Sequence, residues 1–267
     1  MKNKVIIITG ASSGIGKSLA FLLSKGENKL MLASRNHDKL NNVVAKLNKK
    51  NKNIIGYPTD VCNKQECLNL INNCISKFGR IDVLINNAGI SMRAIFNEVN
   101  LEVIEKVMNT NFWGTVYCTK FALPYLLKSH GSLIGISSIA GHVGLPERSA
   151  YSASKFAMNG FLESIRCENM ENKLHVLIAC PGFTKSNIRK EALTKDGHIQ
   201  KNSPRDEKNM MTSEIVAQKI IQAMISRKDN IIISNEGKFA IWLNKLIPKI
   251  ARKLIYNHFK KEKRFNQ

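Results

Sequence analysis

Residues 5–16, Val5-Ile6-Ile7-Ile8-Thr9-Gly10-Ala11-Ser12-Ser13-Gly14-Ile15-Gly16, decide the fold of this chain. The segment begins as a buried parallel strand does, with a short apolar run, and ends in three glycines spaced G-x-x-x-G-x-G. Glycines allow a tight turn and a close backbone approach to phosphate, and the N-terminus of the following helix favours negative charge. An ordinary strand-to-helix turn is the alternative. Three glycines with two serines favour a pyrophosphate site built from Gly10, Ser12, Ser13, Gly14, Ile15 and Gly16.

The remaining chain continues this alternation of apolar strand-like runs and amphipathic helix-like runs. Further strands are expected at 29–33, 54–59, 83–86, 132–137, 175–179 and 231–234. Helices are expected at 17–25, 37–50, 64–78, 100–128, 151–171 and 213–226. This order predicts an α/β protein with a Rossmann-type doubly wound sheet of seven parallel strands flanked by helices. We expect one domain over residues 1–237, followed by an extension over 238–267.

The composition is that of a globular protein, with 43% apolar residues in 267. No apolar run approaches the roughly 20 residues that span a bilayer, and the N-terminal run is too short for a secretory signal. We therefore expect a cytoplasmic protein. The six cysteines are scattered and should be free thiols, and their spacing indicates no metal site.

The net charge of +21 is unusual, because 41 Lys and Arg face only 20 Asp and Glu. Such a charge can indicate nucleic acid, an anionic membrane, an acidic substrate, or mere compositional bias. No nucleic-acid-binding motif or aromatic-interleaved basic stripe is present, so we expect no nucleic-acid partner. The excess is densest in residues 227–267, which hold 11 basic and 3 acidic residues. Basic clusters of this kind are typical of membrane-facing segments.

The C-terminal extension is amphipathic when drawn as a helix. Pro248 should kink it or begin a second segment. An apolar stripe beside a basic face resembles a helix that lies on an anionic membrane, here peripherally at the inner membrane surface. A helix packed on its own domain or on a second subunit remains equally open. The apolar face holds Phe239, Leu243, Leu246, Ile247, Ile250 and Leu254, the basic face Lys238, Lys245, Lys249, Arg252 and Lys253, and Trp242 lies near the border.

The end of the second strand bears on cofactor choice. An acidic residue there holds the ribose 2′-hydroxyl of NAD, whereas an arginine accommodates the 2′-phosphate of NADP. Ser34, Arg35 and Asn36 follow this strand, and the nearest acid, Asp38, lies already in the next helix. The pattern favours NADP(H) over NAD(H), with a solvated surface arginine as the alternative.

Tyr151 and Lys155 are spaced i and i+4, so they share one face of the helix expected at 151–171. A nearby ammonium favours the tyrosine phenolate and lowers its pKa, which suits Tyr151 for acid–base work. A surface cation–aromatic pair is the alternative. Ser138 lies at the end of the fifth strand, at the sheet edge where ligands bind.

With these motifs in order, the chain resembles the short-chain dehydrogenase/reductase family. The resemblance covers residues 4–235 and rests on the glycine turn, Asp60-Val61, the Asn86–Gly89 run, Asn111, Ser138, the Tyr151/Lys155 pair and Pro181-Gly182 with Thr184. It implies a catalytic tetrad of Asn111, Ser138, Tyr151 and Lys155. Tyr151 would exchange a proton with a carbonyl or alcohol oxygen while hydride passes to or from nicotinamide. Ser138 would polarise that oxygen, Lys155 would lower the tyrosine pKa and hold the nicotinamide ribose, and Asn111 would hold a proton-relay water.

The resemblance also implies further cofactor contacts. Asp60 would bind the adenine amino group and Val61 would pack on the ring. Ser13 stands where many NADP-using members carry a basic residue, so the NADP preference depends mainly on Arg35. The remaining implied contacts are Asn87, Ala88 and Gly89 at the adenine ribose, and Pro181, Gly182 and Thr184 at the nicotinamide and its phosphate.

Two downstream segments, 138–146 and 192–197, are similar to the member-7B-like branch of these dehydrogenase/reductases. That branch is associated with lipid or steroid carbonyl reduction at membranes, so the resemblance implies an NADP(H)-dependent oxidoreductase for a lipid-like or steroid-like ketone. A non-catalytic dinucleotide sensor or scaffold on the same fold is the alternative. The family commonly pairs the helices expected at 100–128 and 151–171, which implies a homodimer or homotetramer.

Residues 183–211 form a long polar connection, which in a compact domain is usually a functional lid. A surface insertion is the alternative. Candidate walls of the substrate pocket are Met92, His142, Val143, Leu145 and Phe183, although core packing accounts equally well for the apolar ones.

Overall fold

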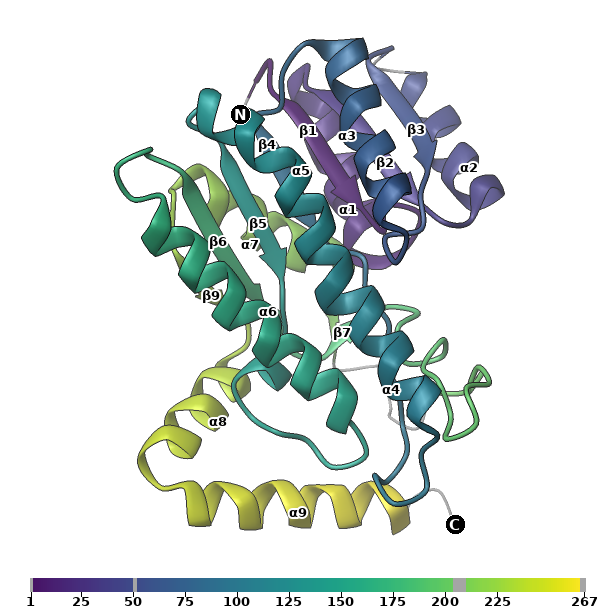
Figure 1. Cartoon of the computed structure of the whole chain (residues 1–267). Coiled ribbons are helices and arrows are strands. Elements are labelled where there is room, and N and C mark those ends of the chain that lie inside the picture. Colours follow the sequence, from purple (N-terminus) through teal and green to yellow (C-terminus); the bar gives the residue numbers. More distant parts are fainter. Residues whose placement is uncertain (1, 50–51, 204–209, 265–267) are drawn as a thin grey trace.

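The structure, a computed structural model, describes residues 2–49, 52–203 and 210–264. Its centre is a seven-stranded sheet in the order β3-β2-β1-β4-β5-β6-β9 (Figure 1). Every neighbouring pair in this sheet runs parallel, so the predicted doubly wound parallel sheet is confirmed. The strands are β1 (Val5–Thr9), β2 (Lys29–Ser34), β3 (Ile54–Pro58), β4 (Val83–Asn86), β5 (Ser132–Ile136), β6 (His175–Cys180) and β9 (Asn230–Ile232).

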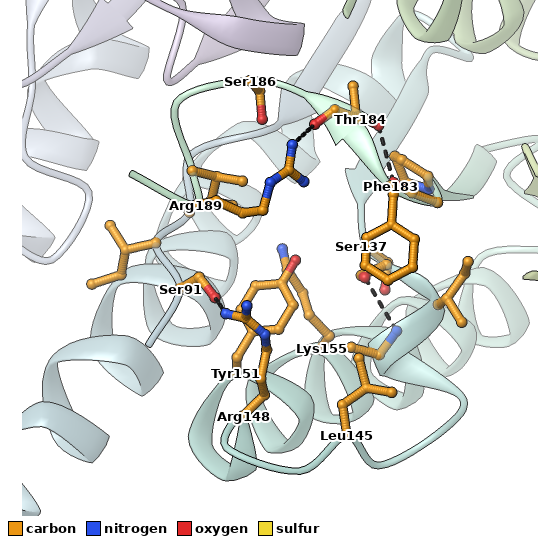
Figure 2. A pocket seen from close by; sticks show the side chains of 18 of the residues that line it. Ser91, Ser137, Leu145, Arg148, Tyr151, Lys155, Phe183, Thr184, Ser186 and Arg189 are labelled. Carbon is orange, nitrogen blue, oxygen red and sulfur yellow. Dashed lines mark hydrogen bonds between the residues drawn. The ribbon is translucent and has the colours of Figure 1, made fainter. Parts of the chain in front are cut away.

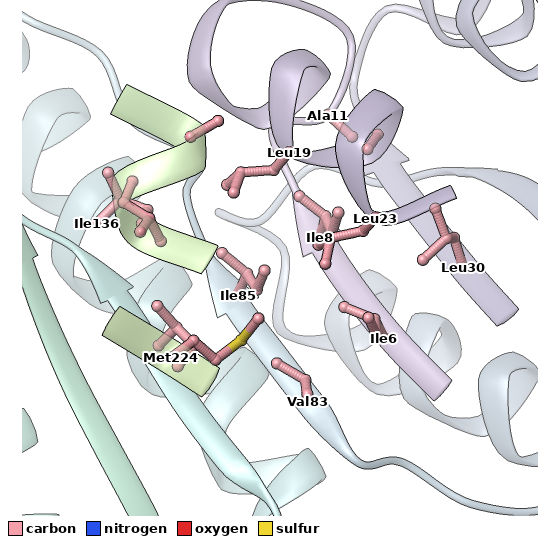
Figure 3. Packing of buried hydrophobic residues seen from close by; sticks show 14 of the residues in the cluster. Ile6, Ile8, Ala11, Leu19, Leu23, Leu30, Val83, Ile85, Ile136 and Met224 are labelled. Atoms are coloured by element: carbon pink, nitrogen blue, oxygen red, sulfur yellow. The ribbon is translucent and has the colours of Figure 1, made fainter. Parts of the chain in front are cut away.

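Helices cover both faces of the sheet. One face packs against α1 (Gly14–Leu23), α2 (His37–Asn48) and α7 (Ser213–Ile225), where side chains such as Leu19 and Met224 meet Ile8 and Ile85 (Figure 3). The other face packs against α3 (Lys64–Phe78), α5 (Gly114–Lys128) and α6 (Ser149–Glu168). Because both faces are covered, the strands read as continuous apolar runs: all five residues of β1 are buried.

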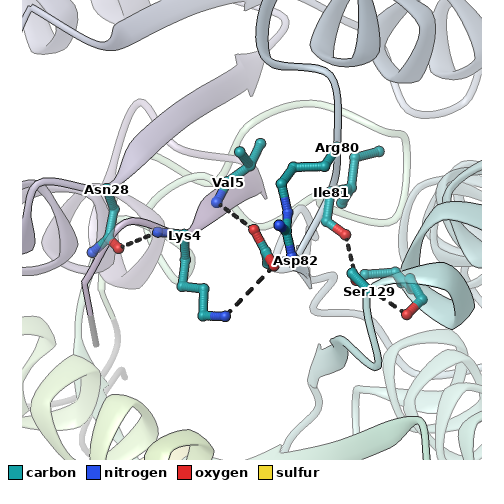
Figure 4. A network of polar contacts seen from close by, with 8 residues as sticks. Lys4, Val5, Asn28, Arg80, Ile81, Asp82 and Ser129 are labelled. Carbon is teal, nitrogen blue, oxygen red and sulfur yellow. Dashed lines mark hydrogen bonds and ion pairs between the residues drawn. The ribbon is translucent and has the colours of Figure 1, made fainter.

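A buried carboxylate holds together the amino ends of two central strands, at the end of the sheet away from the glycine turn. Asp82, directly before β4, accepts a 2.9 Å hydrogen bond from the Val5 N–H and one of 2.6 Å from Arg80 (Figure 4). The Lys4 ammonium lies 3.6 Å from the same carboxylate. Asp82 thus ties the start of β1 to the start of β4.

The helix expected at 100–128 differs from the structure at its centre. α4 (Leu101–Met108) and α5 are joined by one wider π-helical turn, Asn109–Trp113, which holds Asn111. Such turns are frequent at functional sites, and here the side chain of Asn111 makes three hydrogen bonds to neighbouring segments.

The C-terminal extension forms two helices, α8 (Asn235–Leu246) and α9 (Pro248–Arg264). The break at Ile247 follows from Pro248, because a proline disfavours helical geometry in the residue before it and suits the first position of a helix. The break also divides the predicted apolar stripe. Leu243 is buried, while Leu246, Ile250 and Leu254 are each at least half exposed.

The long connection predicted as a lid contains two short strands, β7 (Thr184–Lys185) and β8 (Met211–Thr212), which pair in parallel. Leu193 bridges to Met92 and to Ile199. Residues 204–209 of this connection lie outside the described residues.

Candidate active site

The glycine turn lies between β1 and α1 and is open to a ligand. A Cβ on Gly10 would lie 2.9 Å from Ala88 Cα, and one on Gly16 would collide with the Gly10 carbonyl, so both positions need glycine. Thr9 Oγ1 accepts from the backbone N–H groups of Asn87 and Ala88, each at 3.0 Å, which fixes the second loop against the turn. Ser13 precedes α1 without capping it through its side chain. The N-terminus of α1 therefore suits a phosphate, so the site fits a dinucleotide.

The segment after β2 lines the same cavity as the glycine turn. Ser34 Oγ lies 2.7 Å from Ser12 Oγ and joins the two segments. Arg35 is exposed, and Asn36 accepts a 2.8 Å bond from the Lys39 N–H as the N-cap of α2. Lys39 also lines the cavity and was missed in the sequence, although it lies at i+4 from Arg35. The two cations suit a phosphate group at this end.

The remaining predicted cofactor residues divide into two groups. Val61, Asn87, Ala88, Gly89, Pro181, Gly182 and Thr184 line the cavity. Asp60 does not appear in the described lining; its carboxylate accepts a 3.0 Å bond from the Cys62 N–H, and its own N–H donates to Glu66.

Tyr151 and Lys155 lie side by side on α6 at the cavity (Figure 2). The Lys155 ammonium lies 5.9 Å from the Tyr151 ring centroid and donates a 2.8 Å hydrogen bond to the Ile136 carbonyl. Burial lowers the pKa of Lys155 to about 8. Burial raises the pKa of Tyr151, and a hydrogen bond with Ser138 and the charge of Arg148 oppose this rise.

The two serines after β5 have different roles. Ser137 is buried and donates a 2.6 Å hydrogen bond to Asn159 Oδ1. Ser138 Oγ accepts a 3.1 Å bond from the Ala140 N–H and keeps its own hydrogen for Tyr151 or a ligand oxygen. The structure thus brings Ser138, rather than Ser137, together with Tyr151.

Asn111 lies beneath this group and is fully buried. Its Oδ1 accepts a 2.8 Å bond from the Ile90 N–H, and its Nδ2 donates to the Ile90 carbonyl at 3.0 Å and to Ser154 Oγ at 2.9 Å. Its own carbonyl accepts a 2.9 Å bond from Thr115 Oγ1. Asn111 therefore connects the loop after β4 with α6, the helix that carries Tyr151.

The cavity measures ≈ 1550 Å³. Of the five predicted substrate-wall residues, Leu145 and Phe183 line it, and the other three do not appear in its described lining. Met92 and Val143 are buried. His142 Nε2 lies 3.3 Å from Cys180 Sγ, and burial lowers the pKa of this histidine. Packing against the protein thus accounts for these three side chains.

Two arginines that the sequence analysis missed also line the cavity. Arg148 lies beside Tyr151 and donates to Ser91 Oγ at 2.8 Å, and Arg189 lies on the opposite side and donates to the Thr184 carbonyl at 2.8 Å (Figure 2). Arg148 lies just before the helix expected at 151–171, so helical spacing to Tyr151 gave no signal for it. Arg189 carries no sequence signal, because it reaches the site only through the fold of its loop.

The described residues give no sign of two other classes of site. None of the described helices combines the length and the hydropathy that crossing a bilayer requires. Within the same residues, no group of three or more His, Cys, Asp or Glu side chains could hold a metal ion.

Comparison with known proteins gives one consistent match. A family model described as short chain dehydrogenase matches residues 4–197. "Dehydrogenase/reductase SDR family member 7B" of Xenopus tropicalis is 32% identical over 276 residues, covering 99% of this chain and 88% of that protein. "11-beta-hydroxysteroid dehydrogenase-like 2" of Arabidopsis thaliana is 39% identical over 188 residues, which cover 69% of this chain and 60% of that protein.

Two solved structures share the fold. A short chain dehydrogenase/reductase from Burkholderia phymatum, in complex with NAD, superimposes with a TM-score of 0.84 at 22% identity, covering 93% of this chain and 95% of that one. An alcohol dehydrogenase from Thermococcus sibiricus, complexed with 5-hydroxy-NADP, gives a TM-score of 0.77 at 20% identity, covering 87% and 96%.

Proposed function

Because this chain belongs to the short-chain dehydrogenase family, we propose that it is an NADP(H)-dependent oxidoreductase that interconverts a ketone and a secondary alcohol. The observation that carries the proposal is the placement of Tyr151, Ser138 and Lys155 around the cavity that also holds the glycine turn. Proton-transfer groups and a dinucleotide cradle in one cavity are what hydride transfer to a carbonyl requires.

In the direction of reduction, the carbonyl carbon would take up the hydride that a nicotinamide cofactor held at this site would supply. Tyr151 Oη donates its proton to the carbonyl oxygen, and Ser138 donates a hydrogen bond to the same oxygen. Lys155, whose pKa of about 8 keeps it mostly protonated at neutral pH, stabilises the resulting phenolate and binds the ribose. We place Asn111 in this tetrad as the residue that positions Ile90 and α6.

The NADP(H) preference is supported by Arg35 and Lys39, which both line the cavity beyond β2. Among the structural neighbours, one complex holds NAD and the other 5-hydroxy-NADP, so the fold accepts either cofactor. The predicted contacts from the glycine turn to Thr184 remain part of this proposal, with residues 1–237 as the catalytic domain and 183–211 as its lid.

The test of this function is turnover by a variant that changes one atom. Tyr151→Phe removes only the phenol oxygen, so it should abolish NADPH oxidation with a panel of ketones and leave NADPH affinity unchanged. Phe96→Tyr, at an exposed position in the loop after β4 and absent from the described cavity lining, serves as the control and should retain activity. Full activity of Tyr151→Phe would refute the mechanism, and a wild-type protein that binds NADPH but reduces no ketone would favour a dinucleotide sensor.

The lipid-like or steroid-like nature of the ketone is supported by the apolar part of the cavity lining, which includes Leu145 and Phe183. We also propose a cytoplasmic homo-oligomer, because aromatic side chains are exposed in the π-helical turn that leads into α5 and on α6. Trp113 is 44% and Phe156 46% exposed, and Trp113 stacks on Tyr117 with ring centroids 5.7 Å apart. Light scattering of Trp113→Ser should then show a smaller particle than the wild type.

Peripheral contact with an anionic membrane is supported by the basic side of α9. Lys249, Arg252 and Lys253 are all exposed and are absent from the described cavity lining. Replacing these three with glutamine should weaken sedimentation with phosphatidylglycerol vesicles at low salt, because each contributes about 1 kcal/mol near such a surface. Unchanged sedimentation would exclude this contact.

A further inference from the structure

The inner face of α9 lines the cavity that contains Tyr151. Its apolar lining residues are Ala251, Leu254, Ile255 and Phe259, and its polar ones are Asn257, His258 and Lys260. Steps of three and four residues place the apolar side chains on one face of the helix. The first half of α9, with Ala251, Leu254 and Ile255, therefore turns apolar side chains toward the cavity, and polar residues line it only from Asn257 onward.

The neighbouring elements continue this apolar lining. Phe239 and Leu243 of α8 contribute to it, and so do Leu145 and Pro146, which precede α6. In Figure 1, α8 and α9 lie beyond the carboxyl ends of β5 and β6, the edge of the sheet that carries the catalytic groups. The apolar surface is thus continuous with the catalytic end of the cavity.

This surface borders open space rather than a packed core. Leu254 is 50% and Phe239 56% exposed, although both line the cavity. The three apolar core clusters of the described residues include no residue of α9. Exposed apolar side chains that line a cavity favour the binding of an apolar ligand, because the ligand removes them from water.

The size of the cavity agrees with a second occupant. Ordinary small-molecule sites measure roughly 300–1,000 Å³, and this cavity measures ≈ 1550 Å³. A dinucleotide between the glycine turn and Lys155 would fill one end. The end formed by α8 and α9 would remain free for the part of the substrate that does not react.

We infer that the inner face of α9, with α8, Leu145 and Pro146, is an apolar subsite that binds the hydrocarbon part of an elongated ketone. The inference rests on the proposed function and specifies its substrate class. Polar groups on that part of the substrate are disfavoured, because the subsite is mostly apolar. Each methylene buried there should lower KM by about three- to fourfold until the subsite is full.

The test compares 2-butanone with 2-decanone as substrates of the full-length protein and two matched variants. Leu254→Ser removes an apolar side chain from the inner face. Tyr256→Ser removes one from a position that is 50% exposed and absent from the described lining. We expect the wild type and Tyr256→Ser to have a much lower KM for 2-decanone than for 2-butanone. Leu254→Ser should raise the KM for 2-decanone about tenfold and leave 2-butanone unchanged, which also shows that the variant folds.

A KM independent of chain length in the wild type, or equal effects of the two substitutions, would overturn the subsite. Loss of vesicle sedimentation in Leu254→Ser with an unchanged chain-length profile would overturn it too, because this face would then bind lipid bilayers instead. If no ketone is reduced, the proposed function fails separately. Apolar binding at the subsite is then measured by the fluorescence of bound anilinonaphthalene sulfonate. Leu254→Ser should lower this fluorescence and Tyr256→Ser should not.

Discussion

Asn111→Ala should destabilise the protein and weaken the active site together. The side chain of Asn111 bonds Ile90 in the loop after β4 and Ser154 on α6, and the substitution removes it. Three hydrogen bonds are lost: one that Asn111 accepts from the Ile90 N–H, and two that it donates to the Ile90 carbonyl and to Ser154. Asn111 has no exposed surface, so water cannot replace them directly. The Ile90 N–H and carbonyl then lose their partners in a partly buried loop.

The size of the effect follows from these three bonds. At a net value of roughly 1 kcal/mol each, their loss costs about 3 kcal/mol, and more where a buried group stays unsatisfied. Whole domains are stable by only about 5–15 kcal/mol, so this is a large fraction. For a chain of this size the midpoint of thermal unfolding should fall by about 6–12 °C.

The same loss should reach the cofactor site. A Cβ on Gly89 would lie 3.2 Å from Asn111 Oδ1 and 3.6 Å from Lys155 Nζ, so Asn111 supports the loop directly behind the lysine. When this loop loosens, NADPH affinity and kcat should both decrease. A residue that only held a relay water would lower kcat and leave stability unchanged.

Urea unfolding and NADPH titration measure the two effects. Asn109→Ala is the control, because Asn109 lies in the same π-helical turn but is exposed. We expect a lower urea midpoint with an unchanged slope for Asn111→Ala and values near wild type for Asn109→Ala. Equal stability of the two variants would refute the assignment of Asn111 as a connecting residue.

Three further predictions concern other parts of the molecule. Asp82→Ala should cost about 2–4 kcal/mol of unfolding free energy in urea, because the Val5 N–H loses a charged acceptor, and an Asp82→Asn variant as unstable as Asp82→Ala would contradict this. Arg35→Asp should move the preference from NADPH toward NADH in paired titrations, and an unchanged ratio of the two affinities would exclude Arg35 as the 2′-phosphate contact. Burial lowers the pKa of Lys155 to about 8, so between pH 8 and 10 the unfolded chain binds more protons and the contribution of Lys155 to stability should rise with pH. Urea unfolding across this range should show that rise, up to about 1.4 kcal/mol per pH unit, in the wild type and not in Lys155→Met.

Local patterns in the sequence were sufficient to predict the parallel sheet and the spacing of the proposed catalytic pair. Short apolar runs such as Val5–Thr9, bounded by a glycine turn, are typical of strands buried on both faces, and their alternation with helical patterns indicates a parallel sheet. α3 begins and ends as predicted, at Lys64 and Phe78. The pairing of Tyr151 with Lys155 follows from helix geometry alone, since i and i+4 share a face.

Contacts between distant segments were not predictable in this way. Met92, His142 and Val143 were candidates for the substrate wall, with core packing as the alternative for the apolar ones. The sequence could not decide between the two because the contacts are made with distant segments, such as Cys180 at the side chain of His142. Arg189 lines the cavity in a loop where its guanidinium bonds the Thr184 carbonyl, a contact that no local pattern predicts. The π-helical turn at Asn111 also depends on partners, Ile90 and Ser154, that are 21 and 43 residues away.

The C-terminal extension shows most clearly which properties are local to the sequence and which depend on contacts between distant segments. Its sequence determined an amphipathic segment with a break at Pro248, because side-chain periodicity and proline geometry are local properties. Only the tertiary structure decided that the apolar side of α9 faces the catalytic cavity, because the orientation of a helix depends on the surfaces around it. A hydrophobic stripe fixes which side of a helix avoids water, and the rest of the fold determines what that side meets.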